Sequence, residues 1–513
     1  MYVTLNLKKH LTPKNLFSFF LALHILIWTL VPLYTRVSLH HDVLEGISQG
    51  MSFQLGYSKH PFLSMWIVAS VWKYIGEHDW IMYLLSQCVM VIAFLYIWKL
   101  NHALLSPWKA LIATLFADGL LVFNINANIL TPDTFQIPCW TAIGYYLYKL
   151  SWSPTRKNFM RLGFLYGLGA LIKYQIIVLF VPGFLFFYSI PHLRKQLFSS
   201  AFLWGVLVFL ITFSPHIYWM IKTHFANFDY LYKVVVNAPK QNREALLLEF
   251  LGDTLAFCLP VLVMFVLTFL AAKTKKKTMS SQNQYLIICL AWGPWLMTFL
   301  WLMLFKGNMY SRWMSPYFSF LGTFLLSVVP LQLEVKHLYR FAGVFVTGTA
   351  LLVSINIFKP VYNPHCDAFY PNKEIAQFIE NTWKKEVHQP LFYVGGSRYL
   401  VAAITPYIHP SPKPFFSLDV KTNPWIQDTQ LREKGAVMVW DIHSNYAWDQ
   451  ETLKYSQPPE NLKGMYPFIK ELKSHIFYTS RQQPIEIAYA ILMPEVAQGF
   501  STDLSTENVS KSK

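Results

Sequence analysis

Charged residues are scarce in this 513-residue chain, because Asp, Glu, Lys and Arg together make up only 14% of it. An ordinary soluble domain carries about 25%. Hydrophobic residues reach 54%, and they gather in blocks of roughly 16–22 residues, the length that a helix needs to cross a bilayer core. Backbone that faces lipid must be helical. The composition therefore excludes a water-soluble enzyme and predicts an α-helical polytopic membrane protein.

Cysteine is also scarce, with five residues and no CxxC pair. Four of them lie in apolar blocks and Cys366 stands alone, so we expect small core residues and no disulfide. Histidines and carboxylates are present, but no recognisable metal-ligand spacing joins them. Metal dependence is therefore undecided, and a divalent cation stays open as a cofactor.

Acidic residues are outnumbered by basic ones, 27 to 43, which gives a formal net charge of +16. Such a surplus can indicate nucleic-acid binding. Here the basic residues gather in the loops on one side of the apolar blocks, which is typical of a membrane protein. We expect contact with membrane lipid and no nucleic-acid partner. The positive-inside rule then places 35–79, 215–249 and everything after 358 outside, most simply in the periplasm of a bacterial inner membrane.

About 11 spans are predicted within a membrane domain at 1–358. The apolar run at 16–33 has no cleavage site after it, so it is interpreted as an uncleaved first span. The pair at 161–173 and 175–190 is broken only at Lys173-Tyr174, and the charge rule favours two spans there. The predicted spans are 16–34, 80–98, 107–124, 135–150, 161–173, 175–190, 198–214, 250–271, 284–304, 313–331 and 340–358.

The composition changes after residue 358. Short apolar runs at 391–394, 436–440 and 485–493 are bounded by turn residues and predict buried strands, and 397–407 between two of them predicts a helix. We therefore expect an extracytoplasmic α/β domain at 359–500. A polar tail at 501–513 is predicted to be disordered.

Ionisable residues gather in the predicted outer loops. Asp42 and Glu45 lie three apart in the first outer loop, 35–79, and would share one face of a helix. An apolar stretch at 62–75 in the same loop predicts an interfacial helix. Asp133 lies in the next short outer loop. A helix cap and a solvated acid are the simpler interpretation, but ionisable groups held at a membrane edge usually serve function.

Several short motifs resemble the GT-C class of polyprenyl-phosphate-sugar glycosyltransferases, which includes protein O-mannosyltransferases and lipid A aminoarabinose transferases. Asp42 matches the first acid of that class's first loop, although its second acid is Val43 here. The other matching motifs are Gly56-Tyr57 with His60-Pro61, Thr131-Pro132-Asp133, Leu171-Ile172-Lys173-Tyr174 and Ser214-Pro215-His216. Lys59-His60-Pro61-Phe62 departs from the Glu-Lys-Pro-Pro of the aminoarabinose transferases and lacks the glutamate of a metal ligand.

The resemblance implies transfer of a sugar from a polyprenyl-phosphate donor to a lipid A, envelope-glycan or protein acceptor. Asp42 would be the general base, with Glu45 as its orienter or deputy, and direct attack would invert the sugar. Asp133 would bind a metal or position the sugar. Cations that would neutralise the leaving phosphate are Lys59, His60, Lys173, Lys306 and Arg312.

Plainer interpretations of these residues and of the whole chain stay open. Lys59 could instead extend to lipid headgroups, and Arg312 could be a membrane anchor. A lipid or sugar-lipid transporter is a second hypothesis, but transporters carry polar groups at the midplane and repeated halves, and neither is seen here. A noncatalytic assembly subunit is a third, because Val43 replaces the second acid. The sequence identifies neither the sugar nor the acceptor.

Overall fold

The computed structural model describes residues 12–232, 242–274, 279–304, 311–362, 366–442 and 457–495. Lys306 and the tail at 501–513 lie outside these described residues. The chain divides into two compact units. Unit 1 comprises Met1–Pro32, Ser58–Ser64 and Tyr83–Ile357, and unit 2 comprises Leu33–Tyr57, Met65–Met82 and Phe358–Lys513. The predicted first outer loop therefore contributes residues to both units.

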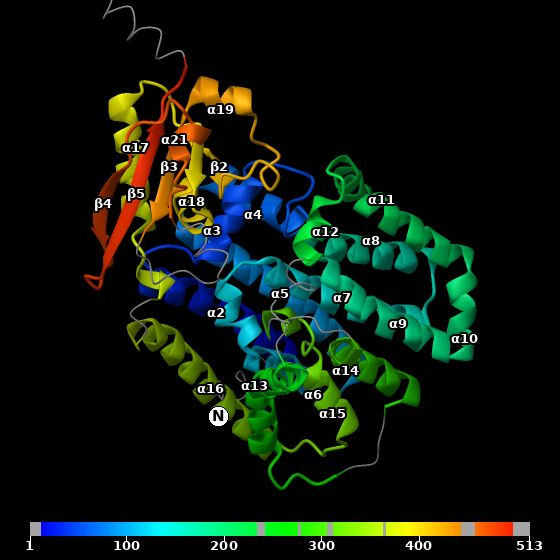
Figure 1. Ribbon diagram of the computed structural model, residues 1–513. Coiled ribbons are helices and arrows are strands. Elements are labelled where there is room, and N and C mark those ends of the chain that lie inside the picture. The colour runs from blue at the N-terminus through cyan, green and yellow to red at the C-terminus, as the bar shows by residue number, and fades with distance from the viewer. Residues whose placement is uncertain are drawn as a thin grey trace, which may run out of the picture. The chain divides into compact units, whose positions relative to one another are not determined.

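The described part of unit 1 consists mainly of helices (Figure 1), with one isolated β-bridge between Thr274 and Leu331. Short 3₁₀ turns join several of its helices: η1 (Phe116–Gly119), η2 (Leu121–Phe123), η3 (Asn126–Asn128), η4 (Tyr174–Ile176), η5 (Lys195–Phe198) and η7 (Ser311–Met314). Its α-helices are α2 (Pro13–Thr35), α5 (Asp79–Leu104), α6 (Pro107–Leu115), α7 (Pro132–Trp152), α8 (Arg156–Ile172), α9 (Ile177–Ser189), α10 (Pro191–Arg194), α11 (Ser200–Lys222), α12 (Ala226–Leu231), α13 (Arg243–Phe269), α14 (Ser281–Leu304), α15 (Leu321–Val328) and α16 (Val335–Tyr362).

Six helices of the described residues are long and apolar enough to cross a membrane, namely α2, α5, α11, α13, α14 and α16. Two bent pairs raise the number to eight if each is one span: Pro107–Gly119 with Leu121–Asn128, bent by 88°, and Tyr174–Ser189 with Pro191–Phe198, bent by 111°. The remaining predicted spans correspond to α7, to α8 with 17 residues and to the segment that contains α15 with 8. The count of 11 is therefore not confirmed.

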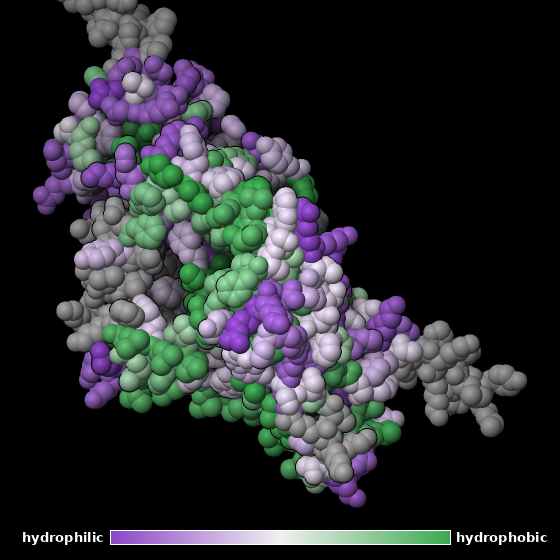
Figure 2. Space-filling model, turned by 90° about the vertical axis from the view of Figure 1, so that its right-hand side faces the viewer, coloured by the Kyte–Doolittle hydropathy of each residue, from purple (hydrophilic) through white to green (hydrophobic). Residues whose placement is uncertain are grey.

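Close packing and an apolar exterior characterise unit 1. Helices α8 and α11 cross at Gly163 and Gly205, where a Cβ on Gly163 would overlap the Gly205 carbonyl. Small residues of this kind let membrane helices approach closely. Large apolar side chains stay exposed along α11, α13 and α16, such as Leu210, Leu255 and Leu351. Figure 2 shows several hydrophobic patches on one face of the molecule, beside polar ones.

Unit 2 contains a five-stranded sheet in the order β2-β1-β3-β5-β4. Strands β1 (Tyr393–Gly396), β2 (Lys413–Phe416) and β3 (Ala436–Asp441) are parallel, and β5 (Pro484–Leu492) runs antiparallel to β3 and to the edge strand β4 (Lys473–Tyr478). The three predicted strand runs are β1, β3 and β5. Sequence reasoning missed β2, which is four residues long and contains Pro414, and β4, whose side chains are mostly exposed.

Helices cover the sheet of unit 2 (Figure 1). They are η8 (Asp367–Phe369), α17 (Asn372–Glu386), α18 (Arg398–Ile404), η9 (Thr405–Tyr407), α19 (Asp428–Lys434) and α21 (Leu462–Met465). The predicted helix at 397–407 is thus α18 continued by η9.

Two helices of the first loop, α3 (His41–Gly50) and α4 (Leu63–Ile75), pack into this unit. The Ser48 hydroxyl donates to the Ala402 carbonyl at 3.0 Å, and the Trp72 indole donates to the Pro406 carbonyl at 3.3 Å. A Cβ on Gly50 would overlap the backbone of Met65. Asp42 and Glu45 are therefore held on a helix that is built into an α/β unit.

Candidate active-site residues

The start of α7 positions Asp133. Thr131 is the N-cap, and its hydroxyl forms a reciprocal capping box with Thr134. Pro132 follows at the first helical position, where its missing N–H costs nothing. Asp133 then lies in the first turn, where the helix dipole favours a negative charge. The Thr-Pro-Asp motif is therefore a helix start that holds a carboxylate in place.

Lys173 meets this carboxylate from the break between α8 and α9. The residue adopts extended backbone directly after α8, as the interruption at Lys173-Tyr174 predicts. Its Nζ lies 2.5 Å from Oδ1 of Asp133, and both residues are 8% exposed. The Gln136 side-chain amide donates to the Lys173 carbonyl at 2.5 Å, so α7 also fixes the backbone at the break. The ion pair therefore sits on two helix ends that share further bonds.

Aromatic and amide groups enclose the pair. The Lys173 ammonium lies 5.2 Å from the centroid of the Trp313 ring, a cation–π distance. The Gln175 amide donates to the Trp313 carbonyl and, at 3.2 Å, to the Tyr317 hydroxyl. Tyr317 stacks on Trp140 with 5.3 Å between ring centroids. These contacts hold η7 against the break that carries Lys173.

Arg312 on η7 brings a second cation to the same place. Its charge acts on Lys173 by direct electrostatic repulsion, and its side chain is exposed. Lysine and arginine side chains are the usual protein contacts to phosphate, so Lys173 and Arg312 are candidates to bind an anionic phosphate.

A second polar group follows Lys173 directly. The Tyr174 hydroxyl lies 2.6 Å from Nε2 of His216 and accepts a hydrogen bond from the Asn227 amide at 2.9 Å. The His216 ring stacks on Trp219 and lies 6.5 Å from the ring of Phe62. His216 of the Ser-Pro-His motif is thus a buried residue that ties α11 to the Lys173 break.

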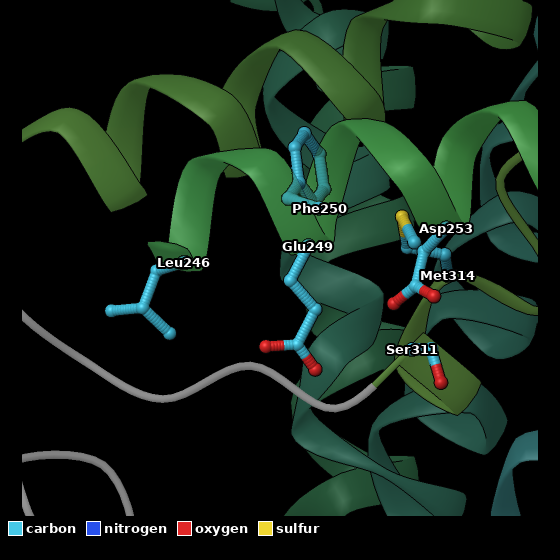
Figure 3. Close-up of a pocket in the computed structure, with 6 residues that line it drawn as sticks. All are labelled: Leu246, Glu249, Phe250, Asp253, Ser311 and Met314. Carbon is cyan, nitrogen blue, oxygen red and sulfur yellow. The ribbon is translucent and has the colours of Figure 1, made fainter. Parts of the chain in front are cut away.

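A small cavity lies beside η7, lined by α13 and by Ser311 and Met314. Figure 3 shows Glu249 and Asp253 projecting from the same side of α13. Its volume of about 10 Å³ accommodates no more than one water molecule. A sugar does not fit there, so this cavity is not a donor site.

The structure does not place the other predicted cations of unit 1 in this cluster. Lys59 and His60 lie in the segment Ser58–Ser64 of unit 1, and both are partly exposed. Lys306 lies outside the described residues. The structure therefore brings together Asp133, Lys173 and Arg312 from the predicted set.

Asp42 lies in the first turn of α3 in unit 2. Its backbone N–H donates to Nδ1 of His40, which is the N-cap, at 3.2 Å. The Asp42 carboxylate lies 3.9 Å from the same imidazole nitrogen and keeps 24% of its side-chain surface exposed. The side chain is therefore fixed at its base and still accessible to solvent.

Asp367 anchors this helix start and was not predicted. Its carboxylate lies 2.8 Å from a guanidinium nitrogen of Arg36 and 3.5 Å from Nε2 of His40, and accepts from the backbone N–H of His41 at 3.4 Å. Burial acts to raise its pKa, but the charges of His40 and Arg36 and these hydrogen bonds outweigh it. They lower the pKa from 3.8 to about 2. Asp367 is thus ionised and paired.

Glu45 is bound on the same helix. Nε of Arg398 donates to Oε1 of Glu45 at 2.8 Å, a second guanidinium nitrogen bonds the same oxygen, and the Gln49 amide donates to it at 3.1 Å. The side chains of Glu45 and Arg398 are 13% and 19% exposed. Arg398 was not predicted, although it follows the Gly-Gly-Ser segment at the end of β1. Glu45 therefore belongs to an ion pair that joins α3 to α18.

A metal site would need several ligands in one place. Among the described residues, no three side chains of His, Cys, Asp or Glu are grouped in this way. The cofactor is not established.

Comparison with known proteins gives a family match and a fold match. Residues 59–219 match the family described as dolichyl-phosphate-mannose-protein mannosyltransferase. A comparison with curated proteins found no match. The matched segment contains Lys59, His60, Asp133 and Lys173, whereas Asp42 precedes it.

Among solved structures, the chain is similar to ArnT from Cupriavidus metallidurans, with a TM-score of 0.59 and 13% identity both when bound to undecaprenyl phosphate and in the apo state. The similarity to the bound form extends over 92% of this chain and 97% of the ArnT chain. The similarity to the apo form extends over 93% of this chain and 98% of the ArnT chain. The archaeal oligosaccharyltransferase AglB from Archaeoglobus fulgidus gives a TM-score of 0.36 at 9% identity, covering 91% and 74%, too low to carry an argument.

These findings confirm the resemblance to the GT-C class. The chain has the ArnT fold over nearly its whole length, and it is a multi-pass membrane protein.

Proposed function

We propose that this protein is an inverting membrane glycosyltransferase that moves a sugar from a polyprenyl-phosphate carrier to an acceptor. The observation that carries the proposal is the cluster of Asp133, Lys173 and Arg312, formed where helices begin or break. The fold similarity and the family match over 59–219 support the same reaction class. An acceptor on lipid A, an envelope glycan or a protein fits this chemistry equally.

On the donor side, the departing phosphate needs positive charge. Lys173 and Arg312 supply it, and Asp133 holds the Lys173 ammonium in a fixed direction. Preorganised charges in a site sheltered from water stabilise a transition state by several kcal/mol. Lys59, His60 and Lys306 are proposed as further contacts to the donor.

On the acceptor side, Asp42 is proposed as the general base. An ionised carboxylate can take the acceptor's proton as the glycosidic bond forms. Attack on the side opposite the phosphate inverts the sugar carbon in a single step. Glu45 is proposed to orient α3 rather than to replace Asp42, because its carboxylate is already bound to Arg398.

The proposed topology has 11 spans, with Asp42 and residues 359–500 on the periplasmic side of a bacterial inner membrane. The surplus of basic residues in the opposite loops supports this orientation. The two bent pairs, the helices α7 and α8 and the segment that contains α15 would supply the five spans beyond the six long helices.

The test compares wild type with Asp42→Asn, using purified protein in proteoliposomes and a radiolabelled polyprenyl-phosphate sugar. Loss of the base should lower transfer by about 10²–10⁴-fold while donor binding persists. Asp428→Asn is the matched control, because Asp428 pairs with Arg432 on an exposed helix of unit 2.

Undiminished transfer by Asp42→Asn would remove Asp42 from its role. A folded wild-type protein that consumes no donor but moves lipid between leaflets would instead support a flippase.

A further inference from the structure

A basic groove lies in unit 1, apart from the candidate active site. It has a volume of about 420 Å³, within the range of small-molecule pockets. Four of its eight lining residues can carry positive charge and none is acidic. The lining residues are Lys14, Trp98, Lys99, His102, Ala103, Tyr145, Tyr148 and Lys149.

The basic side chains of this groove have no carboxylate partner in the described part of the chain. None of the ion pairs formed there includes Lys14, Lys99, His102 or Lys149. Lys99 instead lies 4.8 Å from the centroid of the Tyr96 ring. Like charges that converge without an acid repel one another, and an anion between them relieves that repulsion.

Aromatic rings form the other walls. Trp98 is fixed by stacking on Phe17, with ring centroids 4.7 Å apart, and lies 5.7 Å from the His102 ring. Aromatic side chains that line a basic groove provide an amphipathic wall of the kind found at membrane–water interfaces. The groove therefore suits a ligand with an anionic head and an apolar body.

The groove lies where three helices of the predicted membrane domain begin or end. Its residues come from the start of α2, the end of α5 and the end of α7. Helices α2 and α5 are both long and apolar enough to cross a bilayer. The same helices carry exposed apolar side chains beyond the groove, including Phe19 and Leu23 on α2 and Ile92 on α5.

The groove and the candidate donor site lie at opposite ends of α7. Asp133 is in its first turn and Lys149 in its last. At 1.5 Å per residue the two positions are separated by about 24 Å along the helix axis, close to the thickness of a bilayer core. One phosphate cannot contact both, so the groove takes a second molecule at the other surface of the membrane.

A plainer interpretation is that these lysines only complement helix C-termini or extend to bulk headgroups. It accounts for single basic residues at the ends of α5 and α7. It does not account for Lys14, which comes from the start of a helix, nor for the convergence of all four cations on one aromatic-lined groove.

We propose that this groove binds the phosphate headgroup of an anionic membrane lipid in the leaflet opposite the candidate active site. Lys14, Lys99, His102 and Lys149 contact the phosphate, and the rings of Trp98 and Tyr145 lie against the glycerol and upper acyl region. Basic pockets between membrane helices recognise anionic headgroups by the same chemistry.

The experiment is native mass spectrometry of the full-length protein in detergent, titrated with phosphatidylglycerol or with phosphatidylcholine of identical chains. One phosphatidylglycerol should bind in preference to phosphatidylcholine. Lys99→Gln with Lys149→Gln should weaken that binding at least about tenfold, since each basic residue near an anionic lipid contributes appreciably. Lys99→Arg with Lys149→Arg keeps the charges and should retain the lipid, and a thermal melt verifies that each variant is folded.

Lys157→Gln with Lys195→Gln is the matched control, because both residues are exposed cations outside the groove. Equal binding of the two lipids, or an equal loss in this control, would overturn the proposal. Full displacement by millimolar inorganic phosphate would overturn the lipid as ligand and leave a free-phosphate site.

Discussion

The two units hold their charges in different ways. In unit 1, Asp133 and Lys173 form a single buried pair among aromatic rings, with the second cation Arg312 nearby. In unit 2, the carboxylates of Asp367 and Glu45 each bind several donors. The first arrangement is one ion pair with a second cation near it, whereas in the second each carboxylate is bound by several donors.

This difference distinguishes charged groups that can bind a ligand from charged groups that stabilise the fold. A second cation beside an ion pair can contact a charged ligand without breaking that pair, whereas removing one partner of a buried ion pair is strongly destabilising. Asp367 and Glu45 therefore act as anchors that fix α3 to the rest of unit 2. Asp42 lies on the same helix as Glu45 and keeps the larger exposure, which favours it over Glu45 as a proton acceptor.

Among the variants that test the comparison of the two units, Lys173→Gln is expected to have the largest effect. Loss of a preorganised cation at the leaving phosphate should lower kcat/KM for transfer by about 10²–10³-fold and weaken donor binding. The measurement is transfer in proteoliposomes together with donor binding in detergent. Lys222→Gln, at the end of α11, is the control. Normal donor binding with normal transfer would show that the unit 1 cluster is structural.

The next prediction tests whether Glu45 has a structural role, in its ion pair with Arg398, or acts as a catalytic base. Glu45→Gln and Arg398→Gln each break a largely buried pair and should each cost about 3 kcal/mol of unfolding free energy. The double variant should cost less than the sum, because the two residues form one interaction. The measurement is denaturant unfolding of the full chain. If Glu45→Gln abolished transfer while Arg398→Gln left it intact, Glu45 would be catalytic.

Acid should weaken unit 2 through Asp367. Its pKa is lowered from 3.8 to about 2, so the unfolded chain binds more protons than the folded one between these values. The stability that Asp367 contributes is complete above about pH 4 and is lost as the pH falls towards 2, a change of about 2 kcal/mol. Thermal melts from pH 5 to pH 2.5 should show this slope, and Asp367→Asn should flatten it. An unchanged slope in the variant would assign acid sensitivity to other groups.

The residues of the unit 1 cluster could be singled out as candidates because each belongs to a short local motif. Thr131-Pro132-Asp133 specifies a helix start that presents an acid, and the polar break at Lys173-Tyr174 ends a helix where a cation can turn inward. The pairing of the two was not predicted, because Asp133 and Lys173 are 40 residues apart and were assigned separate roles. The number of spans could not be read in the same way, because polar residues in α7 and bends beside η1 and α10 obscure the hydrophobic blocks.

The anchors of unit 2 could not be predicted because their partners are distant in sequence. Arg36 and Asp367 meet, as do Glu45 and Arg398, only after the first loop packs on the C-terminal sheet. No spacing or periodicity records such a contact. The missed strands have a similar cause: β4 is an edge strand whose exposed side chains carry no alternation, and β2 is specified by pairing with β1 rather than by its own residues.

The smallest expected effect tests whether the helix cap positions the acid of unit 1. Thr131→Val keeps the shape of the side chain but removes the hydroxyl that caps α7, and should cost about 1 kcal/mol of stability. If the cap also directs Asp133 towards Lys173, transfer should fall severalfold, with most of the loss in kcat. Thr131→Ser keeps the hydroxyl and should restore both. Thr155→Val removes the equivalent cap of α8 and should lower stability alone, so equal losses of transfer in the two valine variants would indicate general loosening of unit 1.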